Sequence, residues 1–172
     1  MKLFILLLAI SSFPVLAQDH HHGHAHHAHK TVERKPLGEK DKKILSDALT
    51  INDQLFNALL AKDTKLIEKK SQEISALFQG NKDSIFKELA SKAVNLKTIK
   101  SSTKQEDALK TYEDFLKPLI KVVQGYEIEN SYNVFSCPMV KKSWIQDVRV
   151  NKGVKNVFAP YMLECGTQDT HF

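Results

Sequence analysis

The sequence is poor in cysteine, glycine and arginine, and each shortage excludes a class of protein. Two cysteines and six glycines in 172 residues are too few for a disulfide-rich scaffold or a collagen-like repeat. Arginine occurs only at Arg34 and Arg149, so the formal net charge of +5 comes almost entirely from lysine. Because these lysines are interspersed with acidic residues, we interpret them as solvated helix surface and expect no nucleic-acid partner.

Motifs that define common enzyme classes are also missing from the sequence. It contains no Cys-x-x-Cys redox pair, no His-Glu-x-x-His and no Gly-x-Ser-x-Gly. His171 is the only histidine outside an N-terminal cluster, which leaves no evident base for a serine or cysteine nucleophile. We therefore expect a protein that is not an enzyme.

Residues 1–17 have the layout of a secretory signal peptide. Lys2 precedes an apolar run over 3–10, and Val15 and Ala17 place small residues at the −3 and −1 positions of a cleavage site after Ala17. No later stretch has the 18 or so consecutive apolar residues of a membrane span. We expect a periplasmic or secreted protein that is not inserted in a membrane after cleavage.

Residues 18–38 are rich in histidine and then basic, without apolar periodicity, and predict a disordered tail. An expression tag is an alternative interpretation, but Gly23, Ala25 and Ala28 interrupt the histidines. Neutral imidazole suits Cu(II), Ni(II) and Zn(II), so we expect the tail to bind these ions with little selectivity. The candidate ligands are His20, His21, His22, His24, His26, His27 and His29.

Residues 39–125 repeat apolar side chains at the three-to-four spacing of amphipathic helices. Asp63 or Thr64 is placed to cap a second helix, and Gly80 and Asn81 are expected to end it. The last helix is expected over 105–124, where Pro118 should kink it or end its first half. Four such helices with short connections predict a mainly α fold, an antiparallel four-helix bundle.

Residues 126–172 have a different character, which predicts a short irregular or β-hairpin segment packing on the bundle. Alternating, β-branched stretches at 132–135 and 144–150 resemble strands, and 151–153 carries a turn signal. Trp144 and Tyr161 are interpreted as core anchors, with an aromatic wall beside a bound cation as the alternative.

Every cysteine, and every methionine except Met1, lies in this C-terminal segment, in two short motifs. Thiolates and thioethers are soft ligands that select Cu(I) over calcium or magnesium, so the motifs predict a copper site. The alternative is a plain disulfide, which would close a 28-residue loop and stabilise the fold by about 3–4 kcal/mol. The candidate ligands are Cys137, Met139, Met162 and Cys165.

Four motifs follow one another in this segment: Cys137-Pro138-Met139, Trp144-Ile145-Gln146, Asn156-Val157-Phe158 and Met162-x-x-Cys165-Gly166. Together they resemble a bacterial extracytoplasmic family known as domain of unknown function 3347. The family occurs alone and beside heavy-metal efflux adaptor proteins, and the resemblance implies copper or heavy-metal handling by the four sulfur residues. The chain departs from the family at Asn156-Val157-Phe158, where the family usually has Asn-Pro-Tyr.

These observations predict an extracytoplasmic metal-binding protein, a copper buffer or carrier associated with heavy-metal efflux. Its expected partners are metal ions and an efflux adaptor protein. The alternative is a non-catalytic structural or interaction module of an efflux system, in which Cys137 and Cys165 form a disulfide.

Overall fold

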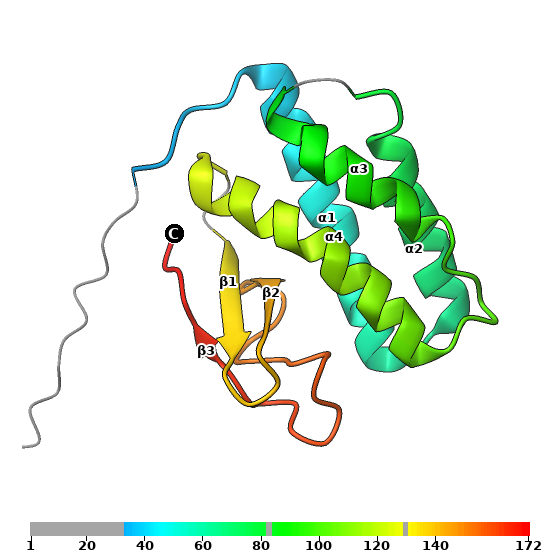
Figure 1. Ribbon diagram of the computed structural model, residues 1–172. Coiled ribbons are helices and arrows are strands. Elements are labelled where there is room, and N and C mark those ends of the chain that lie inside the picture. Colours follow the sequence, from blue (N-terminus) through cyan, green and yellow to red (C-terminus); the bar gives the residue numbers. More distant parts are fainter. Residues whose placement is uncertain (1–32, 82–83, 129–130) are drawn as a thin grey trace, which may run out of the picture. The chain divides into compact units, whose positions relative to one another are not determined.

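The structure, a computed structural model, describes residues 33–81, 84–128 and 131–172. The predicted signal peptide and all seven histidines of the tail lie outside these residues. In the described part, four α-helices and a short 3-10 helix precede three strands, which confirms the mainly helical class (Figure 1). The elements are α1 (Glu39–Ala61), α2 (Thr64–Leu77), η1 (Ser84–Phe86), α3 (Lys87–Leu96), α4 (Gln105–Gly125), β1 (Tyr132–Cys137), β2 (Lys142–Asp147) and β3 (Thr167–Gln168).

The connection between α1 and α2 follows from local chemistry. Lys62 adopts a left-handed conformation with φ 56°, and its N–H donates back to the last turn of α1. Asp63 then caps α2, because its Oδ1 accepts from the backbone N–H of Leu66 at 3.0 Å. Of the two caps that the sequence allows, Asp63 and Thr64, the structure uses Asp63.

The helix α4 runs through Pro118 as one element, so of the two effects predicted for this proline, a kink or an end of the helix, the helix end does not occur. Proline removes one backbone hydrogen bond from a helix interior. Here Pro118 is itself buried, as are Phe115, Leu116 and Leu119 around it. Burial of this face holds the helix together across the missing bond.

The helices share one apolar core, to which each contributes its buried face. Contacts run from α1 to α2, from α2 to α3 and from α3 to α4. The largest fully buried side chains include Trp144 from the sheet, so the core extends from the helices into the strands. The other members of that group on the helices and η1 include Leu45, Leu49, Phe56, Leu59, Ile74, Phe86, Leu89, Leu96, Tyr112 and Phe115.

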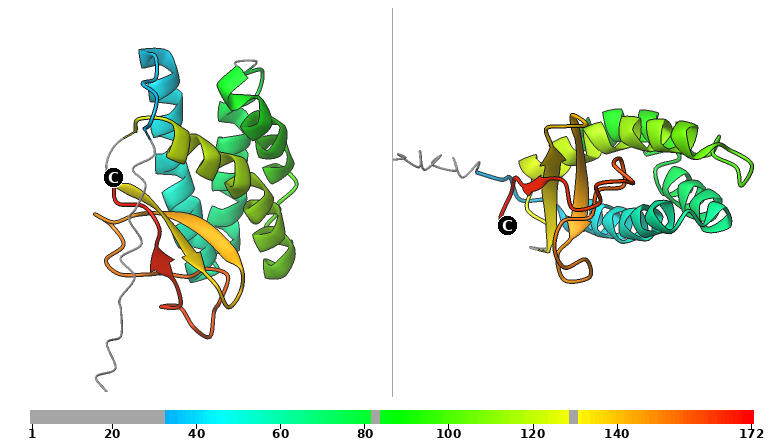
Figure 2. Two further views of the ribbon diagram at one scale, coloured as in Figure 1. Left: turned by 60° about the vertical axis from the view of Figure 1, so that its left-hand side comes forward. Right: turned by 90° about the horizontal axis from the view of Figure 1, so that it is seen from below.

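The three strands form an antiparallel sheet in the order β2-β1-β3, which lies beside α4 and also contacts α1 through β2 (Figure 2). In the register of β1, Phe135 stands opposite Trp144 of β2 and opposite Gln168 of β3. The strand predicted over 144–150 begins earlier and ends at Asp147. Its end is set by the Asp147 carboxylate, which accepts from the backbone N–H of Arg149 at 2.8 Å and turns the chain.

Residues 33–38, which the sequence predicts as the end of a disordered tail, are attached to the fold. The N–H of Lys35 donates to the carbonyl of Gly125, and the N–H of Glu127 donates to the carbonyl of Lys35, both at 2.9 Å. The guanidinium of Arg34 lies 3.7 Å from the ring centre of Phe172. These contacts pair the segment with the chain that follows α4, a pairing that no apolar periodicity could reveal.

Among the helices of the described residues, none combines the length and the apolar character needed to cross a bilayer.

Candidate functional site

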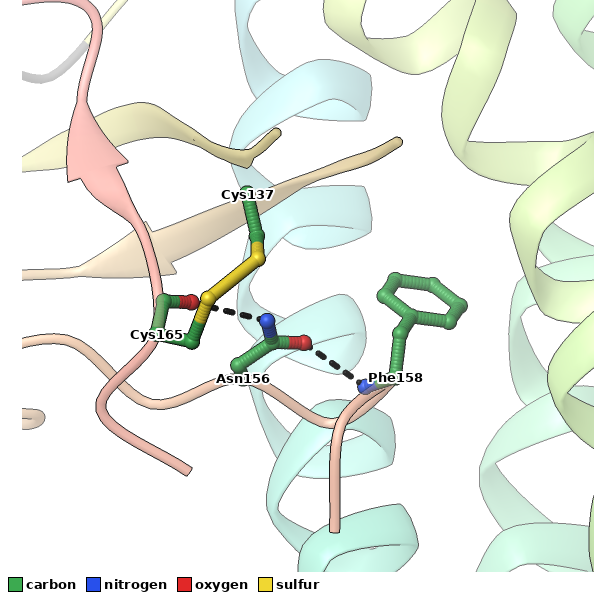
Figure 3. The surroundings of a disulfide bond; sticks show 4 residues. All are labelled: Cys137, Asn156, Phe158 and Cys165. Atoms are coloured by element: carbon green, nitrogen blue, oxygen red, sulfur yellow. Dashed lines mark hydrogen bonds between the residues drawn. A yellow bond between two sulfur atoms is a disulfide. The ribbon is translucent and has the colours of Figure 1, made fainter. Parts of the chain in front are cut away.

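The two sulfur-containing motifs meet at the end of β1. Cys137 is the last residue of β1, and Cys165 lies two residues before β3. Their sulfur atoms are bonded in a disulfide, with the two Cα atoms 5.9 Å apart (Figure 3). The antiparallel pairing of β3 with β1 brings Cys165 to this position, since Thr167 stands opposite Ser136 in the register.

The two methionines lie on the turns that leave this disulfide. Met139 is in the connection between β1 and β2 and is 68% exposed, whereas Met162 precedes Cys165 and is 41% exposed. Cys137 by contrast is 1% exposed. The structure therefore joins the buried Cys137 to the partly buried Cys165 and places both neighbouring thioethers at the surface.

Residues 156–165 form a loop whose base is closed by Asn156. The side-chain Nδ2 of Asn156, which is fully buried, donates to the carbonyl of Cys165 at 2.8 Å. Its Oδ1 accepts from the N–H of Phe158 at 2.9 Å (Figure 3). Its backbone N–H donates to the carbonyl of Leu163 at 2.6 Å. One side chain thus ties the start of the loop to the cysteine at its end.

The sequence patterns assign no role to Asn156, although the residue stands in a motif that carries the family resemblance. Besides Phe158, two residues away, its partners Leu163 and Cys165 are seven and nine residues away, so no local periodicity indicates them. The sequence does show that this polar residue directly precedes two apolar residues, Val157 and Phe158, which was the available signal for its role. Val157 is buried and Phe158 packs against the core, with its ring stacked on Tyr112 at 6.3 Å.

Gln146 fixes the chain that leads into this loop. Its side chain is buried, and Nε2 donates to the carbonyls of Asn151 at 2.9 Å and Gly153 at 2.6 Å. Its Oε1 accepts from the N–H of Lys155 at 3.1 Å. Gln146 and Asn156 both belong to motifs that carry the family resemblance. Their hydrogen bonds shape the segment between β2 and Cys165.

A carboxylate of α1 also holds this segment. Asp53 Oδ1 accepts from Asn151 Nδ2 at 3.1 Å, and the other oxygen accepts from Asn57 Nδ2 at 3.0 Å. Burial raises the pKa of Asp53, and the nearby charge of Asp147 raises it further. Asp147 is buried and paired with Arg149 at 3.0 Å, so this cluster is fully engaged in structural contacts.

The two aromatic residues near the sulfur motifs have opposite environments. Trp144 is completely buried and stacked with Phe135 at 6.0 Å, which confirms its role as a core anchor. Tyr161 is 99% exposed, so the same prediction for Tyr161 is wrong. The reason is its place at the loop tip: Val157 and Ala159 at the start of the loop are buried, and the chain turns outward after them.

The described residues include no group of three or more His, Cys, Asp or Glu side chains arranged to hold a metal ion. Thioethers are not among those side chains, and the histidine ligands predicted for Cu(II), Ni(II) and Zn(II) lie outside the described residues.

No match to this chain is found among models of known protein families, curated proteins or solved structures.

Proposed function

We propose that the protein is an extracytoplasmic copper-binding protein, a buffer or carrier that holds Cu(I) on Cys137, Met139, Met162 and Cys165 in the reduced state. One observation supports this proposal above all: the fold brings the two Cys/Met motifs, 28 residues apart in sequence, to the same place. A soft cation prefers sulfur ligands, and this placement brings two cysteines together with a methionine close to each of them in sequence.

The chemistry restricts the proposal to the dithiol form. A cysteine in a disulfide has no thiolate to offer, so copper binding requires two-electron reduction of the Cys137–Cys165 bond. In the dithiol form, the buried Cys137 would supply the inner side of the site. The exposed thioethers of Met139 and Met162 would supply the side from which the ion enters and leaves.

The remaining parts of the proposal come from the sequence. The helices would act as an antiparallel four-helix bundle that supports the site and the β-hairpin formed by the first two strands. The histidine tail would collect Cu(II), Ni(II) or Zn(II), and a heavy-metal efflux adaptor would be the partner, as the resemblance implies. Periplasmic or secreted localisation follows from the predicted signal peptide.

A second function is favoured by the disulfide itself. A disulfide-stapled segment with an exposed tip suits a structural or interaction module, in which the cysteines only brace the fold. Tyr161 is almost fully exposed, and Leu163 beside it is 44% exposed, as expected for side chains that contact a partner.

Titration with Cu(I) against a competing chelator separates the two functions. The protein is first reduced and freed of reductant, and the wild type is compared with Cys137→Ser and Met162→Leu. Both variants should bind Cu(I) at least tenfold more weakly, since each loses one soft ligand. Leu163→Ala is the matched control, because it changes the neighbouring exposed side chain of the same loop and removes no sulfur.

Equal Cu(I) binding in all four proteins, or none in the reduced wild type, would contradict the copper proposal and favour the interaction module. The same titration on a chain without residues 18–29 tests the tail. That deletion should remove Cu(II) and Ni(II) binding and leave Cu(I) binding unchanged.

A further inference from the structure

We propose that Asn156 is a positioning residue that keeps Cys165 beside Cys137 after the disulfide is reduced. The purpose of this arrangement, a preformed dithiol for a soft metal ion, rests on the proposed function. The contacts that carry the inference do not depend on any metal, and they can be tested without one.

Hydrogen bonds to the backbone hold Cys165 in place in addition to its disulfide bond. The carbonyl of Cys165 accepts from Asn156 Nδ2 at 2.8 Å, and its N–H donates to the carbonyl of Met162 at 2.9 Å. The carbonyl of Leu163 accepts from the N–H of Asn156 at 2.6 Å. Three hydrogen bonds therefore fix the backbone around Cys165, and reduction of the disulfide breaks none of them.

The chain that follows Cys165 is held against β1. Gly166 lies so close to β1 that an added Cβ would stand 2.9 Å from the carbonyl oxygen of Ser136. Thr167 pairs with Ser136, and the N–H of Asp169 donates to the carbonyl of Val134 at 2.8 Å. Cys165 is thus held between Asn156 on one side and the β3 pairing on the other, and its partner Cys137 directly follows Ser136.

Position 156 requires a side chain that both donates and accepts a hydrogen bond, as asparagine does. The amide donates to the carbonyl of Cys165 through Nδ2 and accepts from the N–H of Phe158 through Oδ1. Aspartate would keep the acceptor but lose the donor, and it would place a charge in a fully buried position. Alanine would lose both bonds and leave two backbone groups without their partner.

A consequence is that the two thiols of the reduced protein should meet at a high effective concentration. In exchange with glutathione, the protein S–S bond breaks and a glutathione S–S bond forms. The two hydrogens of the glutathione thiols pass to Cys137 and Cys165, so the exchange is balanced. The equilibrium constant measures how strongly the fold favours sulfur pairing.

The experiment measures this equilibrium in glutathione buffers for the wild type, Asn156→Ala, Asn156→Asp and Asn133→Ala. Asn133 is the matched control because it is also a buried asparagine with two side-chain hydrogen bonds. Its Oδ1 accepts from Thr170 Oγ1 at 3.2 Å and from the N–H of Phe172 at 3.0 Å, beyond β3. Both Asn156 variants should lower the constant for disulfide formation at least about tenfold, since Asn156→Asp loses one side-chain hydrogen bond and Asn156→Ala loses two. Asn133→Ala should lower it less than about twofold. An equal shift in Asn133→Ala, or no shift in Asn156→Ala, would overturn the inference.

A measurement without substitution covers the case in which the Asn156 variants fail to fold. In the reduced wild type, the amide hydrogens of Asn156 and Phe158 should remain protected from exchange with solvent, since their acceptors do not involve sulfur. Loss of that protection on reduction would overturn the inference. Cu(I) titration of the same samples separates it from the proposed function: a reduced wild type with protected amides that binds no Cu(I) contradicts only the copper proposal.

Discussion

At the scale of single residues, Tyr112 links the helical core to the loop that carries Cys165. Its hydroxyl donates to Asn52 Oδ1 at 3.0 Å, and its ring stacks on Phe158 at 6.3 Å. Burial raises the pKa of Tyr112, with a smaller contribution from the negative charge of Asp53. The neutral hydroxyl is therefore part of the folded structure, and its ionisation would oppose folding.

Tyr112→Phe should lower the free energy of unfolding at neutral pH by about 1–3 kcal/mol, because Asn52 Oδ1 is left buried without a donor. In the wild type, stability should fall as the pH rises above about 10, where the unfolded chain releases the tyrosine proton and the folded chain retains it. The variant should lose stability less steeply over that range. Urea denaturation at several pH values from 8 to 11 measures both effects.

Tyr161→Phe is the control for this prediction, because it removes the same hydroxyl group from a side chain that is 99% exposed. Parallel stability curves for the wild type and Tyr112→Phe above pH 10 would show that Tyr112 ionises in the folded state, against the prediction.

At the scale of elements, local signals predicted the parts of the fold that local interactions build. The Asp63 cap and the apolar spacing within α1 to α4 depend on residues within a few positions of each other, and both were predicted. Pro118 does not end the helix, one of the two effects predicted for it, because the burial of α4 outweighs its local preference. The two-residue strand β3 was missed, because only its pairing with a strand some thirty residues earlier defines it.

The same distinction applies to the candidate site. The soft character of Cys137, Met139, Met162 and Cys165 is visible in the sequence, and the disulfide was one of the two arrangements considered for them. The bonds of Asn156 to Leu163 and Cys165 cross a loop, so they could not be derived from spacing. Their existence follows only once β3 has placed Cys165 beside β1.

Gly166 marks the position where β3 approaches the core most closely, and Gly166→Ala should weaken this attachment. Its φ is 149°, and an added Cβ would stand 2.8 Å from Trp144 Cη2 and 2.9 Å from the carbonyl oxygen of Ser136. We expect the free energy of unfolding to fall by about 1–3 kcal/mol, because either the strand or the buried indole must shift. Chemical denaturation followed by tryptophan fluorescence measures the change.

Gly125→Ala is the control for Gly166→Ala, because an added Cβ there meets nothing within 4 Å. A loss in Gly166→Ala no larger than that of the control would mean that β3 can move away from Trp144 at little cost.

At the scale of the whole molecule, the sulfur-containing segment is held by more than its disulfide. The segment after Asp147 contributes Val157 to the apolar core of the helices, and hydrogen bonds from Gln146 and Asn156 also hold it. A fold of this kind should survive reduction of its one disulfide. Survival is also what the proposed copper site requires, since the ion binds only the dithiol form.

The double variant Cys137→Ser/Cys165→Ser should therefore fold like the wild type but unfold more easily. Opening the 28-residue loop should lower the free energy of unfolding by about 3–4 kcal/mol, because the unfolded chain gains the freedom that the disulfide removed. The far-UV circular dichroism spectrum should stay unchanged, since the bonds from Asn156 and the pairing of β3 remain. Urea denaturation of the oxidised wild type, the reduced wild type and the double variant tests this, with the last two expected to agree.

If the variant instead lost secondary structure or cooperative unfolding, the disulfide would be essential to the fold. A metal site that requires its reduction would then be excluded.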